Sequence, residues 1–203
     1  MMPDIEMDPT RVAVIGVHWQ HDVVSPDGLF GPYFADQVAR HRVASYAARL
    51  MAAVRSSGGL VVHSRIAFRP GYPDLIANTP AFATIGEQGG FLDGDPKTEI
   101  IDEVAPQVGD IVFTHARLTA FFGTELDVIL RARGVKTVLL TGVATNLSVA
   151  GTAFEAVNHG YRMAVVSDAC AAATDEMHRV TLEGIGLLGQ VVTTDVVVRG
   201  LTG

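Results

Sequence analysis

The sequence predicts an α/β protein with a parallel β-sheet that is covered by helices on both faces. Apolar runs of strand length recur along the chain, and the segments between them show helical periodicity, an alternation typical of parallel sheets. The chain has 203 residues, of which 48% are hydrophobic and 18% are charged, enough for one domain with a sizeable core. We expect a single domain over residues 1–203, with an N-terminal arm at 1–10 and a long loop excursion at 68–97.

The six strands are predicted from the apolar runs, each of which has the length of a buried strand. In chain order the expected strands are Val12–Val17, Leu60–His63, Asp110–Phe113, Thr137–Thr141, Met163–Ser167 and Gln190–Val198.

The helices are predicted from the periodic segments between these runs. They are expected at roughly Ala35–Ser57, Thr124–Arg133, Asn146–Asn158 and Asp175–Leu188. The first three are followed by glycines (Gly58 and Gly59, Gly134, Gly160) at the place where a helix C-cap is expected.

The stretch Phe68–Lys97 is rich in glycine and proline and has little periodic pattern, which is typical of a surface loop. Long loops in compact domains often carry function. We expect this excursion to set the selectivity of a ligand pocket.

Charge and composition exclude several classes of partner. The formal net charge is −7 and no Lys/Arg run occurs, so the electrostatic attraction that nucleic-acid binding needs is missing. The acidic N-terminal residues do not form a signal peptide, and no apolar stretch reaches about 18 residues, so we expect a soluble cytoplasmic protein without a membrane partner. The only cysteine, Cys170, excludes an internal disulfide and is interpreted as a small buried hydrophobic residue.

Histidines stand at the ends of three predicted strands: His18, His63 and His115. Because ligands of open parallel sheets bind outside the carboxyl ends of the strands, these side chains are candidates for one site. They would form a new zinc site only if their nitrogens met at the metal, and hydrogen bonding between neighbouring histidines is the commoner arrangement. We therefore expect no metal site.

Three motifs carry a resemblance to a known family. They are Val14–Asp22 (VIGVHWQHD), His115–Thr124 (HARLTAFFGT) and the turn Leu140–Val149 (LTGVATNLSV). With the strand pattern they cover about residues 11–195 and resemble the isochorismatase-like (cysteine) hydrolases. The prediction is a three-layer α-β-α sandwich with a six-stranded parallel sheet in the order 3-2-1-4-5-6.

The resemblance also shows how this chain departs from the family. Each member of the family's aspartate–lysine–cysteine triad is replaced: His18 stands for the aspartate, His115 for the lysine and Ser148 for the cysteine. The Asp-x-His pair with which nicotinamidases of the family hold a metal does not occur in this chain. The resemblance thus implies a hydrolase that works without metal or organic cofactor, and a changed catalytic chemistry.

The replacements are chemically coherent for acyl transfer. A serine hydroxyl needs a neighbouring base, and imidazole, with a pKa near 6.5, suits that role better than a carboxylate. His18 is predicted as general base for Ser148, with His115 as its acid–base partner and backbone N–H groups at Val143, Ala144 and Ser148 holding an oxyanion. The substrate is expected to be a small metabolite that can carry a carboxylate.

Three alternatives remain open from the sequence. Ser148 can be a helix cap rather than a nucleophile. The two histidines can act as paired acid and base in a lyase or isomerase that needs no nucleophile. The chain can also be an inactive family member that binds a metabolite or a protein partner.

Other predicted site residues follow from the motifs. We expect the substrate to be contacted by Trp19, Arg65, Arg117, Phe121 and Phe122. The two arginines would pair with a carboxylate of the substrate. Gln20, Asp22 and Asn146 are expected to tie loops together, and Asp168–Ala171 to be structural. The resemblance further implies a cis peptide bond between Val143 and Ala144, and a homodimer or larger homo-oligomer in which loops of a neighbour close the pocket.

Overall fold

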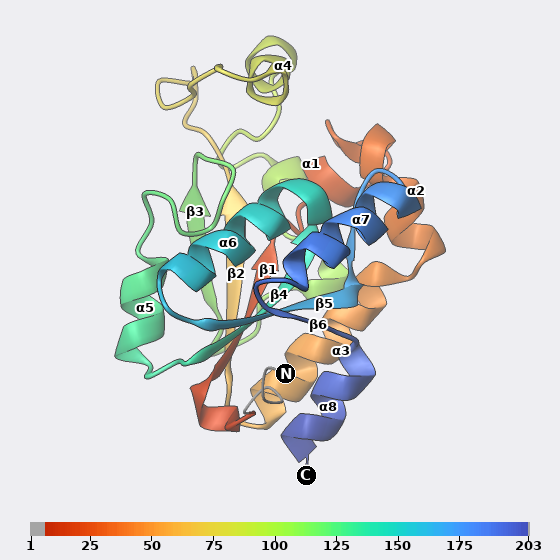
Figure 1. Cartoon of the computed structure of the whole chain (residues 1–203). Helices are drawn as coiled ribbons and strands as arrows, with labels where there is room; N and C mark the ends of the chain where they lie inside the picture. Colours follow the sequence, from red (N-terminus) through yellow and green to blue (C-terminus); the bar gives the residue numbers. More distant parts are fainter. Residues whose placement is uncertain (1–6, 203) are drawn as a thin grey trace.

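The structure, a computed structural model, describes residues 7–202, so that residues 1–6 of the predicted N-terminal arm lie outside the described residues. A six-stranded parallel sheet forms its centre, with the order β3-β2-β1-β4-β5-β6 (Figure 1). This confirms the predicted strand order. The strands are β1 Val12–Val17, β2 Leu60–Ile66, β3 Ile111–His115, β4 Thr137–Val143, β5 Arg162–Ala171 and β6 Gln190–Val192.

The two central strands are buried along their whole length. Every residue of β1 and β4 is buried, because helices pack on both faces of the sheet. Residues of β1 alternate between two apolar cores: Val12 and Val14 face one core, whereas Ala13, Ile15 and Val17 face the other. A parallel sheet covered on both faces is thus confirmed.

The helices are distributed over both faces of the sheet. Buried residues of α3 and α8 belong to the first core, and those of α5, α6 and α7 to the second (Figure 1). The bounds are α1 His21–Val24, α2 Gly31–Arg40, α3 Val43–Ser56, α4 Pro80–Gln88, α5 Leu126–Ala132, α6 Ala150–Asn158, α7 Asp175–Ile185 and α8 Thr194–Thr202. Within residues 7–202, no helix combines the length and the apolar character needed to cross a bilayer.

Two helical predictions differ from the structure. The helix expected over Ala35–Ser57 is divided into α2 and α3, because Arg42 lies in the left-handed region with φ 54°. The excursion at 68–97 contains α4, which begins with the Thr79 hydroxyl accepting a hydrogen bond from the N–H of Phe82. Figure 1 shows α4 standing apart from the other helices, beyond the carboxyl ends of β1–β3.

The last predicted strand, Gln190–Val198, is wrong beyond Val192. The chain turns into α8, where the Asp168 carboxylate accepts hydrogen bonds from the N–H and the hydroxyl of Thr194, both at 2.8 Å. Val197 and Leu201, one helical turn apart, are buried in the core beside α3. Tertiary packing here prevails over the strand preference of a run of valines.

Candidate active site

The register of the sheet brings three polar side chains to the carboxyl ends of β1, β2 and β3. Val17 is paired with Ser64, and Ile66 with His115, so His18 follows β1 beside Ser64. The N–H of His18 donates a hydrogen bond of 3.0 Å to the Ser64 carbonyl oxygen. His18 has a φ of 55°, an uncommon conformation for a residue with a side chain, and this turn directs the chain out of the sheet.

Both histidines and the serine are in contact. Nε2 of His18 lies 3.2 Å from Nε2 of His115, and the Ser64 Oγ lies 2.7 Å from the same nitrogen of His115. Two imidazoles that share such a contact need opposite roles, one Nε2 carrying a hydrogen and the other a lone pair. The contacts therefore couple the tautomers of the two rings.

Burial makes both imidazoles neutral. Desolvation lowers the pKa of His115 from 6.5 to about 4. The pKa of His18 is also lowered well below its usual value, first by burial and second by repulsion from His115. Both rings are thus neutral at neutral pH, and each has one nitrogen with a hydrogen and one with a lone pair.

Ser148, the predicted nucleophile, follows the end of β4. A cis peptide bond joins Val143 to Ala144, and a π-helical turn over Thr145–Val149 follows, continued by α6. Ser148 lies in this turn and is 5% exposed. Gly142, with φ 134°, lets the turn start because any side chain there would overlap the backbone of Val17.

A cavity of about 390 Å³ lies against this turn. Its lining includes His18, Ser148, Val143 and Ala144, together with the first residues of α4. His115 and Ser64 are not among its lining residues, but His115 contacts the lining residue His18. The cavity therefore brings together His18 and Ser148, with His115 behind His18.

His63, the third histidine, lies elsewhere. Its Nε2 is 3.3 Å from the Asp110 carboxylate, which also forms a salt bridge of 2.7 Å with Arg55. Burial lowers the pKa of His63 and outweighs the opposing effect of Asp110. Among residues 7–202, no three His, Cys, Asp or Glu side chains gather closely enough to hold a metal ion.

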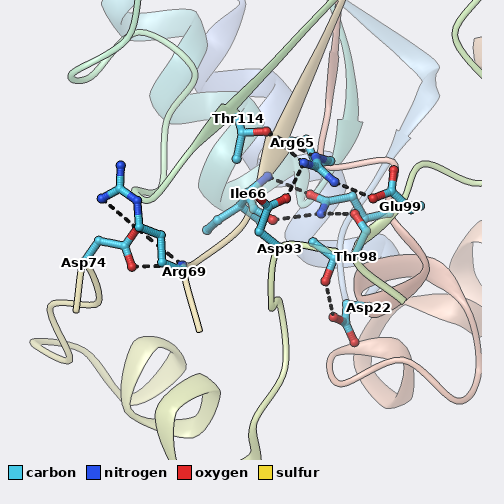
Figure 2. Close-up of polar contacts among 10 residues, drawn as sticks. Asp22, Arg65, Ile66, Arg69, Asp74, Asp93, Thr98, Glu99 and Thr114 are labelled. Carbon is cyan, nitrogen blue, oxygen red and sulfur yellow. Dashed lines mark hydrogen bonds and ion pairs between the residues drawn. The ribbon is translucent and has the colours of Figure 1, made fainter. Parts of the chain in front are cut away.

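The two predicted substrate-binding arginines contact protein groups. Figure 2 shows Arg65 between Asp93, Glu99 and Thr114, with salt bridges of 2.7 and 2.6 Å to the two carboxylates. The Arg117 guanidinium donates to the carbonyl of Ile76 and to the side chain of Asn78, and stacks 4.5 Å above the ring of Phe82. Neither arginine lines the cavity.

The predicted aromatic contacts also lie outside the cavity lining. Trp19 is buried in the first core, the one that also contains Val12 and Val14. Phe121 stacks on His159 with ring centroids 4.9 Å apart. Phe122 points to solvent and is 63% exposed. The aromatic lining comes instead from Phe30, Phe34, Phe82 and Phe91, which the motifs did not identify.

Gln20 and Asp22 tie the loops around the site together, as predicted. The Gln20 amide donates to the carbonyls of Ile66 and Thr98 and accepts from the N–H of Ile66. The Asp22 carboxylate accepts from the N–H of Phe91 at 2.8 Å and from Thr98, the latter contact drawn in Figure 2. Both side chains are buried and hold the excursion against the helix that follows β1.

Sequence similarity to known proteins extends over most of the chain. Residues 12–196 match the isochorismatase domain. An uncharacterised isochorismatase family protein, YwoC of Bacillus subtilis, is 32% identical over 185 residues, which is 91% of this chain and 90% of that protein. Maleamate amidohydrolase of Pseudomonas putida is 34% identical over 155 residues, 72% of this chain and 68% of that enzyme.

Solved structures agree with the fold. A cysteine hydrolase from Pseudomonas syringae pv. phaseolicola superimposes with a TM-score of 0.88 at 26% identity, covering 97% of this chain and 94% of that one. N-carbamoylsarcosine amidase from Thermoplasma acidophilum gives a TM-score of 0.73 at 29% identity, covering 91% and 97%. Together with the matched domain, these similarities establish that the chain belongs to the isochorismatase family of hydrolases.

Proposed function

We propose that this protein hydrolyses an acyl bond of a small molecule, with Ser148 as nucleophile, His18 as general base and His115 as the residue that orients His18. The observation that carries this proposal is the 3.2 Å contact between the two Nε2 atoms, beside a cavity that His18 shares with Ser148. Two relatives, an amidohydrolase and an amidase, support an amide as the bond that is cleaved.

The proposal gives the two nitrogens of His18 different roles. Because Nε2 faces His115, Nδ1 is the nitrogen left to accept a proton from Ser148. The proposal therefore requires a hydrogen on Nε2 of His18, which donates to the lone pair on Nε2 of His115. When His18 becomes protonated, this hydrogen bond strengthens because its donor is then charged.

Acylation follows from this arrangement. Ser148 Oγ forms a bond with the substrate carbonyl carbon while its proton passes to His18, and the carbonyl oxygen becomes an oxyanion. Backbone N–H groups at Val143, Ala144 and Ser148 are proposed to hold that oxyanion, because these residues lie at the end of β4 and in the turn after it, and all three line the cavity. The oxyanion then collapses and expels the leaving group, which takes the proton from His18.

Deacylation repeats the same proton transfers with water. Water attacks the acyl carbon and gives its proton to His18, and the Ser148 oxygen recovers that proton as the acid leaves. Ser64 is proposed as a positioning residue, because its hydroxyl lies 2.7 Å from Nε2 of His115. As a donor, this hydroxyl would share the single lone pair of that nitrogen with the Nε2–H of His18, so that the hydrogen of the His115 ring stays on Nδ1. In the proposed arrangement Ser64 contacts His115, His115 contacts His18, and His18 exchanges the proton with Ser148.

The position of His115 favours this mechanism over a lyase or isomerase. A paired acid and base would both have to reach the substrate, whereas His115 is absent from the cavity lining. His115 contacts Ser64 and His18 instead. A role in orienting His18 is therefore the one that the contacts support.

The test is the reaction with p-nitrophenyl acetate followed from the first turnover. We expect a burst of nitrophenolate equal to the amount of enzyme, and an acetyl group on the Ser148 peptide in mass spectrometry. Ser148→Ala should abolish the burst, and His18→Ala should slow it by at least about a hundredfold, as for a lost general base. A burst that persists in Ser148→Ala would overturn the proposal.

A further inference from the structure

The cavity beside Ser148 has an unusually apolar lining for a site that carries out proton transfer. Among the described residues, its lining contains no Asp, Glu, Lys or Arg. His18, Ser148 and Thr79 are its polar members, and every other lining residue is apolar. His18 is neutral because burial lowers its pKa.

The apolar walls come from segments that lie far apart in the sequence. Phe30 and Phe34 come from the region of α2, Phe82 and Ile85 from α4, and Phe91 from the chain after α4. The rings of Phe30 and Phe91 contact each other with centroids 5.5 Å apart. Buried aromatic surface of this kind stabilises apolar and aromatic groups by contact area and offers no counter-charge.

The cations nearest in sequence to the site motifs are engaged by other groups. The Arg117 guanidinium stacks on the ring of Phe82, a lining residue, and Arg117 itself is not part of the lining. Arg65 is paired with two carboxylates at 2.7 Å or less (Figure 2). A carboxylate entering the cavity would therefore lose its hydration without gaining an ion pair, which is strongly unfavourable.

We infer that the substrate is an uncharged molecule whose non-reacting part is apolar or aromatic. This inference rests on the proposed function for the identity of the reacting bond, but the lining argument concerns binding alone. It departs from the carboxylated metabolite that Arg65 and Arg117 suggested in the sequence. The α4 segment, which supplies Phe82 and Ile85, is then the part of the chain that selects the apolar group.

Two fluorescent probes that share one ring system test this inference. N-phenyl-1-naphthylamine is neutral, whereas 8-anilinonaphthalene-1-sulfonate carries an added sulfonate. The cavity has the volume of an ordinary small-molecule site, so both probes can be compared in it by direct titration. We expect the natural protein to bind the neutral probe at least about tenfold more tightly than the anionic one.

A positive charge placed in the lining should weaken this preference. Leu147 lines the cavity and is 47% exposed, so Leu147→Arg can be accommodated without disturbing the core. We expect it to narrow the preference for the neutral probe by about tenfold or more, since it supplies the missing counter-charge. Leu187→Arg adds the same charge at a residue that is 84% exposed and outside the cavity, and should leave the preference unchanged.

The outcomes separate this inference from the proposed function. Equal or tighter binding of the anionic probe by the natural protein, no measurable binding of the neutral probe, or an unchanged preference in Leu147→Arg would each overturn the inference. Ser148→Ala should keep the neutral-probe affinity while losing the acetylation burst. If the natural protein shows the probe preference but no burst, the proposed mechanism fails and the inferred ligand class stands.

Discussion

Acid should destabilise this protein through its buried histidine pair, and His115→Gln should remove a measurable part of that effect. Burial lowers the pKa of His115 in the folded protein to about 4, against 6.5 in the unfolded chain. Between these values the unfolded state binds a proton that the folded state does not. The free energy of unfolding therefore falls as the pH falls below 6.5, and this loss levels off below about pH 4.

The magnitude follows from the two pKa values. Proton linkage gives a loss from His115 of about 2 kcal/mol between pH 7 and pH 5, and of about 3 kcal/mol once the pH is below both values. His18 adds a loss of the same sign, because its pKa is lowered as well. Glutamine at position 115 keeps a polar group of similar size but has no proton to bind in this range.

The assay is urea unfolding followed by the fluorescence of Trp19, the single tryptophan, which is buried. From pH 7 to pH 5 the natural protein should lose about 2 kcal/mol more than His115→Gln. Between pH 8 and pH 7 the two proteins should change by nearly the same amount, because His115 is mostly neutral in both the folded and the unfolded state. An equal loss in both proteins between pH 7 and pH 5 would refute the assignment of a neutral buried pair.

Three further predictions concern the frame of the site. Gly142→Ala should lower the free energy of unfolding by at least about 3 kcal/mol, because its φ is 134° and a Cβ would overlap the Val17 carbonyl. The control is Gly160→Ala, where the φ is also positive but no atom lies within 4 Å of the added Cβ. Urea unfolding of this variant should show a loss of only about 1 kcal/mol. Ser64→Ala should slow the p-nitrophenyl acetate burst by about fivefold to tenfold, the value of one buried hydrogen bond, and shift its pH profile, whereas an unchanged rate and profile would exclude Ser64 from the positioning of His115. Cys170, whose pKa is raised to about 12 by burial, should not react with Ellman's reagent at pH 8 until urea unfolds the chain, and rapid reaction of the folded protein would contradict its place in the core.

Much of the fold could be predicted because its signals are local and repeated. Strands β1 and β4 are continuous apolar runs, and they lie where the runs predicted them. The glycines after α3, α5 and α6 have positive φ at Gly58, Gly134 and Gly160, which agrees with their predicted capping role. Such patterns depend on only a few neighbouring residues, so they can be recognised without knowledge of tertiary contacts.

The errors occur where distant contacts decide the local structure or where the local signal is short. The valines before Val198 favour a strand by propensity, yet Asp168 and the surface of α3 hold them in α8. The helix α4 was not predicted, although Thr79, Pro80 and Gly89 are residues that commonly begin and end helices. These signals were present but short, and periodicity within the excursion is weak.

At the candidate site, too, the features with a local sequence signal were predicted and those that depend on distant contacts were not. The motifs placed His18, His115 and Ser148 at strand ends, and the sheet register brings the two histidines into contact. The contact of Ser64 with His115 depends on the pairing of β2 with β1 and β3, which no motif specifies. Likewise, Arg65 and Arg117 stand at strand ends, but their carboxylate, carbonyl and amide partners come from the excursion and the chain just after it.

The measurement that most directly tests an activated Ser148 is intact-mass labelling with a small fluorophosphonate at about pH 7.5. We expect one phosphonyl group per chain, located on Ser148 by peptide sequencing, and its loss in both Ser148→Ala and His18→Ala. The double requirement distinguishes a serine activated by His18 from a surface residue that reacts slowly. Labelling at another residue, or labelling of Ser148 at an undiminished rate in His18→Ala, would contradict the account.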